Sequence, residues 1–278
     1  MTMQRIPILC YHSVAAKRDP RFAEWTVSPE DFAAQMLYLA ENGYRPLTVA
    51  ELVERAFRRR ERIDPKTVAI TFDDGFADFH AEAWPVLRRH SFPATVYIAT
   101  GFVGETSGWL APDGEADRPM LTWSQIEELS AAGIECGAHG HEHVQLDTVS
   151  AARADRDIRR SRDSLEEVVG PVKSFAYPHG YYTTRVRRQV AQAGFTSACA
   201  MKHALTNPED DPFAIARAVV YGGVDLDGFA RLLRGEGIGD APGERRLRRG
   251  AWRTVRRAGA EPLVRRLRSS TAGSGASR

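Results

Sequence analysis

Two clusters of side chains that bind metals or move protons stand out in the sequence. Asp73 and Asp74 follow the apolar run TVAITF, and His139, His141 and His143 lie within HGHEH, directly after IECGA. Both runs are typical of buried strands, so each cluster is expected where a strand ends and a loop begins. In parallel α/β folds these strand ends share one edge, which is the functional one. The sequence therefore predicts that the two clusters converge.

These residue types point to a catalytic metal site. Two histidines and a carboxylate bind a divalent cation on one face and leave other positions open, as catalytic rather than structural sites require. Each cluster alone has a plainer interpretation, since adjacent aspartates often form turns and clustered histidines can be a solvated surface. Their joint occurrence after two strands favours the metal site.

The composition is that of an ordinary globular protein. The 278 residues are 43% apolar, and 38 lysines and arginines against 36 aspartates and glutamates leave a net charge of +2, which gives no reason to expect nucleic acid. Cys10, Cys136 and Cys199 are too far apart for a disulfide framework or a C-x-x-C site. We see no signal peptide in MTMQRIPILCYH and no segment of membrane-spanning length. These features predict a cytoplasmic protein, free or peripheral at the inner face of the membrane.

Short apolar runs alternate with longer amphipathic segments through most of the chain. The predicted strands cover 8–11, 67–72, 94–99, 134–138 and 174–177. The predicted helices cover 28–42, 77–90, 124–132, 151–169 and 184–193. Six or seven such repeats predict an α/β fold with a largely parallel sheet, closed as a barrel or curled like one.

The composition changes near the C-terminus, where arginines crowd together from about Glu244 and the chain closes on SSTAGSGASR. We predict a catalytic domain over 1–240 and an arginine-rich tail over 241–278 that is partly helical or disordered. Apolar residues recur among the arginines at roughly helical spacing, which suits a basic segment lying on an anionic membrane. A solvated tail is the equal alternative.

Three phrases, in this order, resemble the leading motifs of the polysaccharide deacetylases, the NodB-homology or carbohydrate esterase family 4 enzymes. They are TFDDG at 71–75, HGHEH at 139–143 and FAYPHG at 175–180. The likeness covers roughly 5–220, and LCYHSV resembles the opening of the poly-N-acetylglucosamine deacetylase-like branch. The resemblance implies a distorted (β/α) barrel of about seven parallel strands. It also implies a metal-dependent hydrolase that removes N-linked or O-linked acetyl groups from an amino sugar, a polysaccharide or a glycan precursor.

The resemblance also implies the metal ligands and the base. Asp74, His139 and His143 would hold one divalent ion, with zinc first and cobalt, nickel or manganese as alternatives. Asp73 would be the general base that takes a proton from metal-bound water as it attacks the acetamide carbonyl. Adjacent residues at a strand end point in different directions, so one carboxylate can face the metal and its neighbour the substrate.

A general acid must then protonate the departing amine. In the branch resembled here the histidine of the YH pair has that part, which makes His12 the candidate and His203 the alternative. The oxyanion would be held by the metal and by a backbone N–H from the 176–178 loop, with Tyr177, Pro178 and His179 at the substrate.

Three positions depart from the family pattern. Gly140 stands where a serine or threonine is usual, so a hydroxyl that would steady the metal loop is missing, and His141 adds a donor nearby. Ala176 stands where many members have an arginine that orients the catalytic aspartate. Arg217 either supplies that charge from a neighbouring strand or is a surface arginine. His179 replaces a tyrosine, and it either lines the substrate groove or caps the loop.

Two other functions are compatible with the same motifs. One is a catalytically impaired glycan-binding protein, and the other is a membrane-associated glycan assembly factor whose function lies in the tail. A binding protein has no need of the free carboxylate of Asp73, which favours the enzyme. The expected partners are an N-acetylated saccharide or a lipid-linked glycan and, through the tail, an anionic membrane. Trp109, Trp123, Tyr181 and Tyr182 are expected near the site, although core packing is the plainer alternative for most of them.

Overall fold

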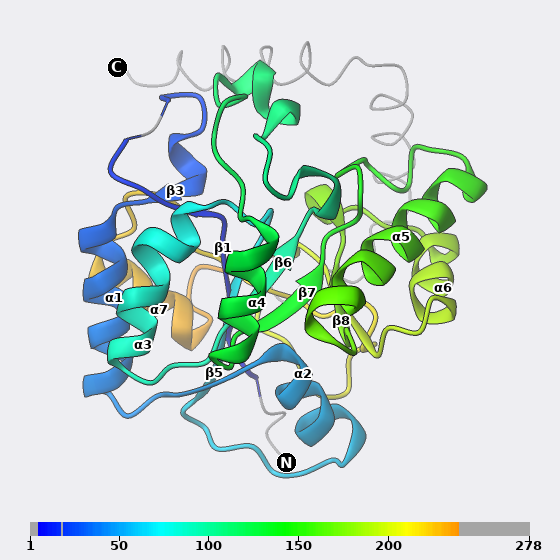
Figure 1. The fold of residues 1–278 in the computed structure, drawn as a ribbon. Helices are drawn as coiled ribbons and strands as arrows, with labels where there is room; N and C mark the ends of the chain where they lie inside the picture. The colour runs from blue at the N-terminus through cyan, green and yellow to red at the C-terminus, as the bar shows by residue number, and fades with distance from the viewer. Residues whose placement is uncertain (1–4, 18, 239–278) are drawn as a thin grey trace, which may run out of the picture.

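The computed structural model describes residues 5–17 and 19–238, and its centre is a strongly curled parallel sheet (Figure 1). Its strands run in the order β10-β1-β5-β6-β7-β8-β9, with β4 beside the start of β5. Their bounds are β1 Ile8–Tyr11, β4 Arg45–Leu47, β5 Thr67–Phe72, β6 Thr95–Ile98, β7 Glu135–Ala138, β8 Ser174–Ala176, β9 Ser197–Cys199 and β10 Ala218–Val219. The short strands β2 Ser13–Val14 and β3 Thr26–Val27 pair separately.

The two ends of the sheet are joined by the segment that leads into β10. Ile215 pairs with Cys199 of β9 as a parallel bridge, and its carbonyl accepts the N–H of Ala200 at 2.8 Å. Three residues later, Ala218 of β10 pairs with Leu9 of β1. The sheet therefore curls back on itself, and the predicted distorted (β/α) barrel with seven parallel strands along its main path is confirmed.

Helices cover the outside of the sheet, with α1, α3 and α7 packed together and α4, α5 and α6 following one another around it (Figure 1). Their bounds are α1 Pro29–Glu41, α2 Val49–Leu52, α3 Trp84–Arg89, α4 Trp123–Ala131, α5 Ala151–Val169, α6 Thr184–Gln192 and α7 Leu226–Arg234. Side-chain caps start most of them: Ser28 accepts the N–H of Asp31, and Ser150 accepts that of Arg153.

One predicted helix begins with a different hydrogen-bond pattern. The segment predicted as a helix over 77–90 is π-helical over Phe79–Ala83 and continues directly as α3. Pro85 lies just after this change, and it has no N–H to donate to the preceding turn.

The sheet separates two layers of apolar side chains. A large cluster fills the space between the strands and the outer helices, and a smaller one, which includes Ile8, Ala69, Tyr97 and Ile215, combines side chains of the sheet with α2 and its neighbours. Arg217 is the largest side chain that is fully buried among the described residues. A buried guanidinium needs a partner, and it finds one at the site described below.

In the part of the chain that the structure describes, no helix is long and apolar enough to cross a membrane. The predicted boundary at 240/241 and the arginine-rich tail lie outside the described residues.

Candidate active site

The predicted convergence of the two clusters takes place at the carboxyl ends of neighbouring strands. Asp73 and Asp74 follow β5, and the Asp73 N–H donates to Tyr11 O of β1 at 3.0 Å. His139 follows β7, and its N–H donates to Ile98 O of β6 at 2.9 Å. Backbone hydrogen bonds of the sheet thus fix the positions of Asp73 and His139.

Asp74, His139 and His143 form a compact buried group. Asp74 Oδ1 lies 3.3 Å from His139 Nε2 and 3.1 Å from His143 Nε2. One ligand atom from each residue lies within 4.8 Å of the other two. Asp74 and His143 have positive φ angles, +75° and +50°, a conformation that L residues adopt rarely and that here turns both side chains toward the same point.

The hydrogen bonds of this group fit a divalent cation. His139 Nδ1 lies 2.8 Å from Ala176 O, which can only accept, so Nδ1 carries a proton and Nε2 is the nitrogen that faces Asp74 and is available to a cation. Neither ring nitrogen of His143 has a hydrogen-bond partner, although both are buried. Burial alone would raise the pKa of Asp74, but the imidazoles of His143 and His139 hold it well below its usual range. Lone pairs directed at one buried point repel unless a cation or proton lies between them.

Arg217 binds Asp73 with both ends of its guanidinium. Its Nη1 donates to Asp73 Oδ1 at 2.5 Å and its Nη2 to Oδ2 at 2.7 Å, and Nη1 is also 3.3 Å from Thr71 Oγ1. The arginine is fully buried, so the alternative of a surface arginine is wrong. Burial raises the pKa of Asp73, yet Arg217 and His139 outweigh it and keep this carboxyl below its usual range. Asp73 is therefore ionised and fixed in orientation.

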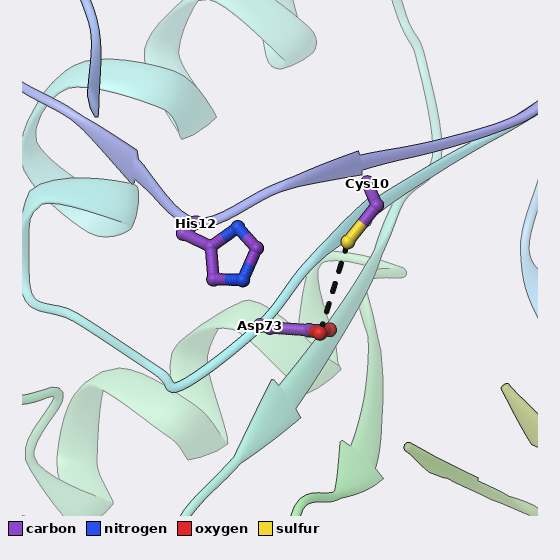
Figure 2. A group of neighbouring side chains, drawn as sticks. All are labelled: Cys10, His12 and Asp73. Atoms are coloured by element: carbon purple, nitrogen blue, oxygen red, sulfur yellow. Dashed lines mark hydrogen bonds between the residues drawn. The ribbon is translucent and has the colours of Figure 1, made fainter. Parts of the chain in front are cut away.

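His12 and Cys10 lie beside Asp73 (Figure 2). Tyr11 pairs with Phe72 in the sheet, so the residues that follow them, His12 and Asp73, leave neighbouring strands side by side. The His12 ring packs edge-on against Trp25, with centroids 4.8 Å apart. Burial lowers the pKa of His12, although the carboxylates of Asp74 and Asp73 oppose that shift.

His203, the alternative acid, occupies a different place. Its Nδ1 accepts the N–H of Val219 in β10 at 3.2 Å, and its ring lies against Tyr221 with centroids 5.6 Å apart. Burial lowers the pKa of His203. Of the two predicted acids, the structure thus groups His12 with Asp73.

The loop after β8 corrects one expectation. The predicted backbone donor of the 176–178 loop is not at Tyr177, because that N–H donates to Cys199 O at 3.1 Å, nor at Pro178, which has none. His179 follows with φ +57°, and its Nε2 lies 3.3 Å from His143 O. Burial and the neighbouring His143 lower the pKa of His179 to about 3, so its ring is neutral, and it packs beside His143 with centroids 4.7 Å apart.

Asp157 of α5, which the sequence did not single out, steadies the histidine loop. Its carboxylate accepts the N–H groups of His141 and Glu142 at 3.1 and 2.7 Å. Gly140 has φ +74°, and a Cβ there would lie 2.6 Å from Asp157 Oδ1. The hydroxyl missing at Gly140 is thus replaced by a carboxylate that leaves no room for a side chain. His141 turns away, with Nδ1 2.9 Å from Thr100 Oγ1, and is not a ligand of the buried group.

Replacing Gly140 by alanine should therefore destabilise the protein for two separate reasons. The positive φ costs about 1–2 kcal/mol, and the new methyl group displaces Asp157. The control is Gly43→Ala, because Gly43 has φ +70° and nothing lies within 4 Å of the place that a Cβ would take, so this variant carries the backbone cost alone. Urea unfolding should show a larger loss for Gly140→Ala, and calorimetric titration should show weakened divalent-ion binding in that variant only. Equal losses and unchanged ion binding in both variants would contradict the role of Asp157.

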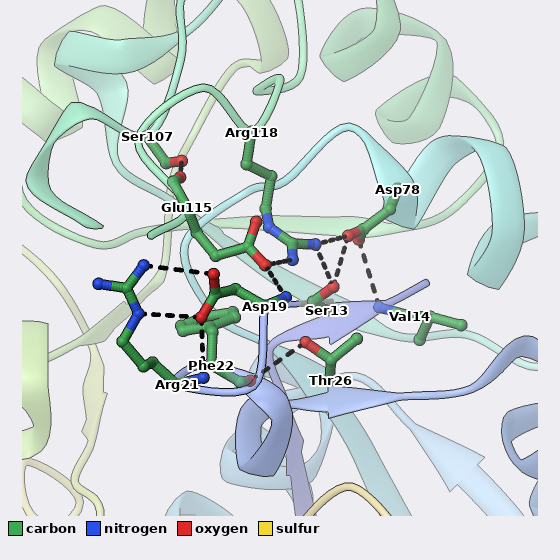
Figure 3. Close-up of polar contacts among 10 residues, drawn as sticks. All are labelled: Ser13, Val14, Asp19, Arg21, Phe22, Thr26, Asp78, Ser107, Glu115 and Arg118. Carbon is green, nitrogen blue, oxygen red and sulfur yellow. Dashed lines mark hydrogen bonds and ion pairs between the residues drawn. The ribbon is translucent and has the colours of Figure 1, made fainter. Parts of the chain in front are cut away.

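A largely buried ionic network holds the 105–120 segment in place (Figure 3). Arg118 Nη1 donates to Ser13 Oγ at 2.6 Å and to Asp78 Oδ2 at 2.9 Å, and its Nη2 lies 3.1 Å from Glu115 Oε1. The network joins β2, the segment after β5 and the 105–120 segment. Trp109 of that last segment packs on the His143 ring with centroids 4.6 Å apart. Charges this far apart in sequence give no pattern by which the network could be predicted.

The network should give the protein a pH dependence that can be measured. Burial raises the pKa of Asp78 from 3.8 to about 6, although Ser13 and Arg118 oppose the shift. As pH rises from about 4 to 6, the unfolded chain releases this proton before the folded one, so the folded state loses stability. Relative to Asp78→Asn, the wild-type free energy of unfolding should fall by about 3 kcal/mol over that range and stay level above it.

Urea unfolding at closely spaced pH values checks this. Asp163→Asn on the exposed face of α5 is the control and should show no such change relative to wild type. A difference between wild type and Asp78→Asn that is flat from pH 4 to 6 would mean that Asp78 is ionised throughout.

The chain is similar in sequence and in fold to known proteins. The family model for polysaccharide deacetylase matches residues 60–198. The poly-β-1,6-N-acetyl-D-glucosamine N-deacetylase of Staphylococcus aureus is 23% identical over 220 residues, which cover 76% of this chain and 71% of that protein. Among solved structures, the Streptococcus pyogenes deacetylase PplD in complex with acetate has a TM-score of 0.72 at 24% identity and covers 84% of this chain and 99% of its own. IcaB from Ammonifex degensii has a TM-score of 0.69 at 25% identity, with 83% and 96% covered.

Proposed function

The chain belongs to the polysaccharide deacetylase family, and we propose that it hydrolyses the N-acetyl group of an amino sugar within a saccharide by metal-dependent catalysis. One observation carries the proposal: the ionised Asp73, held by Arg217, lies next to the buried group of Asp74, His139 and His143. A metal site alone could be structural. A second, free carboxylate beside it is what hydrolysis requires.

In this mechanism Asp74, His139 and His143 would hold the ion. A divalent ion bound there supplies Lewis acidity, which makes a carbonyl carbon more electrophilic and a water molecule more acidic. Zinc is the first candidate because two imidazoles and one carboxylate with open positions are typical of catalytic zinc, and cobalt, nickel or manganese suit the same donors.

Asp73 takes the proton of the attacking water. Its pairing with Arg217 weakens it as a base, because the guanidinium stabilises the charged carboxylate. The same pairing fixes the direction of its oxygens and keeps them ionised, so the geometry for proton transfer exists before substrate binds. Arg217 thus makes Asp73 a weaker base but a better oriented one.

His12 delivers a proton to the departing nitrogen, since it is the imidazole grouped with Asp73. For the oxyanion, the backbone N–H of His179 is the donor that the loop offers once Tyr177 is engaged in the sheet and Pro178 is excluded. The neutral ring of His179 and the ring of Trp109, both packed on His143, would line the substrate beside the reacting carbonyl.

The reaction is tested by acetate release from N-acetylglucosamine oligomers and from candidate lipid-linked sugars. Asp73→Asn should lower the rate roughly 10²–10⁴-fold, because it removes the base but keeps the shape. His12→Gln should lower it strongly, whereas His203→Gln, which retains a similar size beside β10, should keep most of it. No acetate from any substrate, with Asp73→Asn equal to wild type, would overturn the proposed function. Loss in His203→Gln but not in His12→Gln would reverse the assignment of the acid.

The metal site has a test of its own. Elemental analysis of desalted protein should find about one divalent ion per chain in wild type and none in His139→Ala, since a three-ligand site does not survive the loss of one ligand. His141→Ala is the matched control, because this neighbour bonds Thr100 and should leave the ion in place. Equal retention or equal loss in both variants would contradict the assigned ligands.

The saccharide that carries the acetylated amino sugar is a separate proposal. The Staphylococcus aureus relative is named for poly-β-1,6-N-acetyl-D-glucosamine, which makes that polymer the first to assay. A lipid-linked glycan, with the arginine-rich tail on an anionic membrane, remains our second proposal. The glycan-binding alternative is disfavoured by the Asp73–Arg217 pair, for which a binding protein has no use.

A further inference from the structure

We propose that Cys10, His12 and Asp73 form a second, weaker site for a thiophilic divalent cation such as zinc or cadmium. Occupation of this site would inhibit the deacetylase. The binding itself does not depend on the proposed function, whereas the inhibition does.

The three side chains gather from two adjacent strands (Figure 2). Cys10 and His12 are two residues apart at the end of β1, so they share one face, and Asp73 comes from the neighbouring β5. Cys10 Sγ lies 3.7 Å from Asp73 Oδ2, and one ligand atom from each of the three residues lies within 4.8 Å of the others.

The His12 imidazole is incompletely paired. Its Nδ1 is buried and has no hydrogen-bond partner. Buried polar atoms are nearly always paired, because an unpaired one loses its hydration without compensation. The ring is already packed against Trp25, so it is held in place while this nitrogen stays unsatisfied.

The donor set selects the kind of cation. A thiolate, an imidazole and a carboxylate suit zinc, and the sulfur favours zinc and cadmium over magnesium, calcium or manganese. Binding forms a metal–sulfur bond and releases the thiol proton of Cys10 to solvent, so no oxidant or reductant is needed. Cys10 is fully buried, and besides Asp73 its sulfur approaches the carbonyl oxygen of Tyr11 at 3.9 Å, a weak contact that a metal–sulfur bond would readily replace.

Charge makes this site the weaker of the two. Arg217 already binds both oxygens of Asp73, so an incoming cation approaches a guanidinium and a carboxylate whose charges largely cancel. Asp74 is the next residue after Asp73, and an ion that it holds would repel a second cation further. The second site should therefore fill only after the first.

The consequence for catalysis follows from shared residues. Asp73 and His12 are the proposed base and acid, and a cation bound to both would occupy the lone pairs that move the protons. Zinc beyond one equivalent should thus inhibit, although the first equivalent activates.

Cobalt titration of metal-free protein tests the binding by absorption. After the first equivalent, further cobalt should produce a thiolate-to-cobalt charge-transfer band in the near ultraviolet. The band should vanish in both Cys10→Ser and Cys10→Ala, whose folding is checked by circular dichroism. Cys136→Ser is the matched control, because Cys136 is likewise buried but its sulfur faces Ile126 O of α4. This variant should leave the band intact.

His139→Ala separates this proposal from the proposed function. It removes a ligand of the first site, so the charge-transfer band should persist and appear with the first equivalent added. Absence of the band in wild type at any cobalt concentration, or its persistence in both Cys10 variants, would overturn the second site. Failure to release acetate would overturn the enzyme but not this result.

Inhibition is measured by acetate release at rising zinc, each variant relative to its own maximum. Wild type and Cys136→Ser should be inhibited beyond one equivalent, and Cys10→Ser should need roughly 10-fold more zinc or higher for the same effect. Identical inhibition curves for Cys10→Ser and wild type would overturn the inhibitory role.

Discussion

The ion pair between Arg217 and Asp73 is the interaction on which the rest of the site depends. A fully buried guanidinium is tolerated only if its charge is matched, and removing one partner of such a pair costs about 3–5 kcal/mol. Arg217 lies between Ile215, which bridges to β9, and Ala218, which pairs with β1. The pair therefore couples the joining of the two sheet edges to the orientation of the Asp73 carboxylate.

Two adjacent carboxylates serve two purposes because the chain turns sharply between them. Asp73 continues the line of β5 and meets Arg217, whereas Asp74 has φ +75° and meets His139 and His143. These different surroundings suit the two roles that we propose, a base at Asp73 and a metal ligand at Asp74. The cost is a strained backbone at Asp74, which the paired strands on either side of β5 can sustain.

Residues outside the site hold its loops in place. Asp157 fixes the histidine loop through two backbone N–H groups, and Arg118 joins three segments so that Trp109 rests on His143. Both supports are buried carboxylate or guanidinium groups whose partners come from other elements. They give rigidity where loops alone would be mobile, which is what a site that positions water and substrate needs.

The amino-acid sequence alone was enough to predict the strands 8–11 and 67–72, because short continuous apolar runs are typical of buried parallel strands. It was also enough to predict the clusters of polar side chains that follow β5 and β7. It also determined the helix at Ser28 and the family, because caps and motifs are local patterns. Only the tertiary structure decided that Arg217 is buried on Asp73, 144 residues away, that Asp157 fills the space at Gly140, and that Tyr177 cannot offer its N–H. Pairings of this kind depend on how the sheet curls, and that is set by the packing of the whole barrel rather than by any local run of residues.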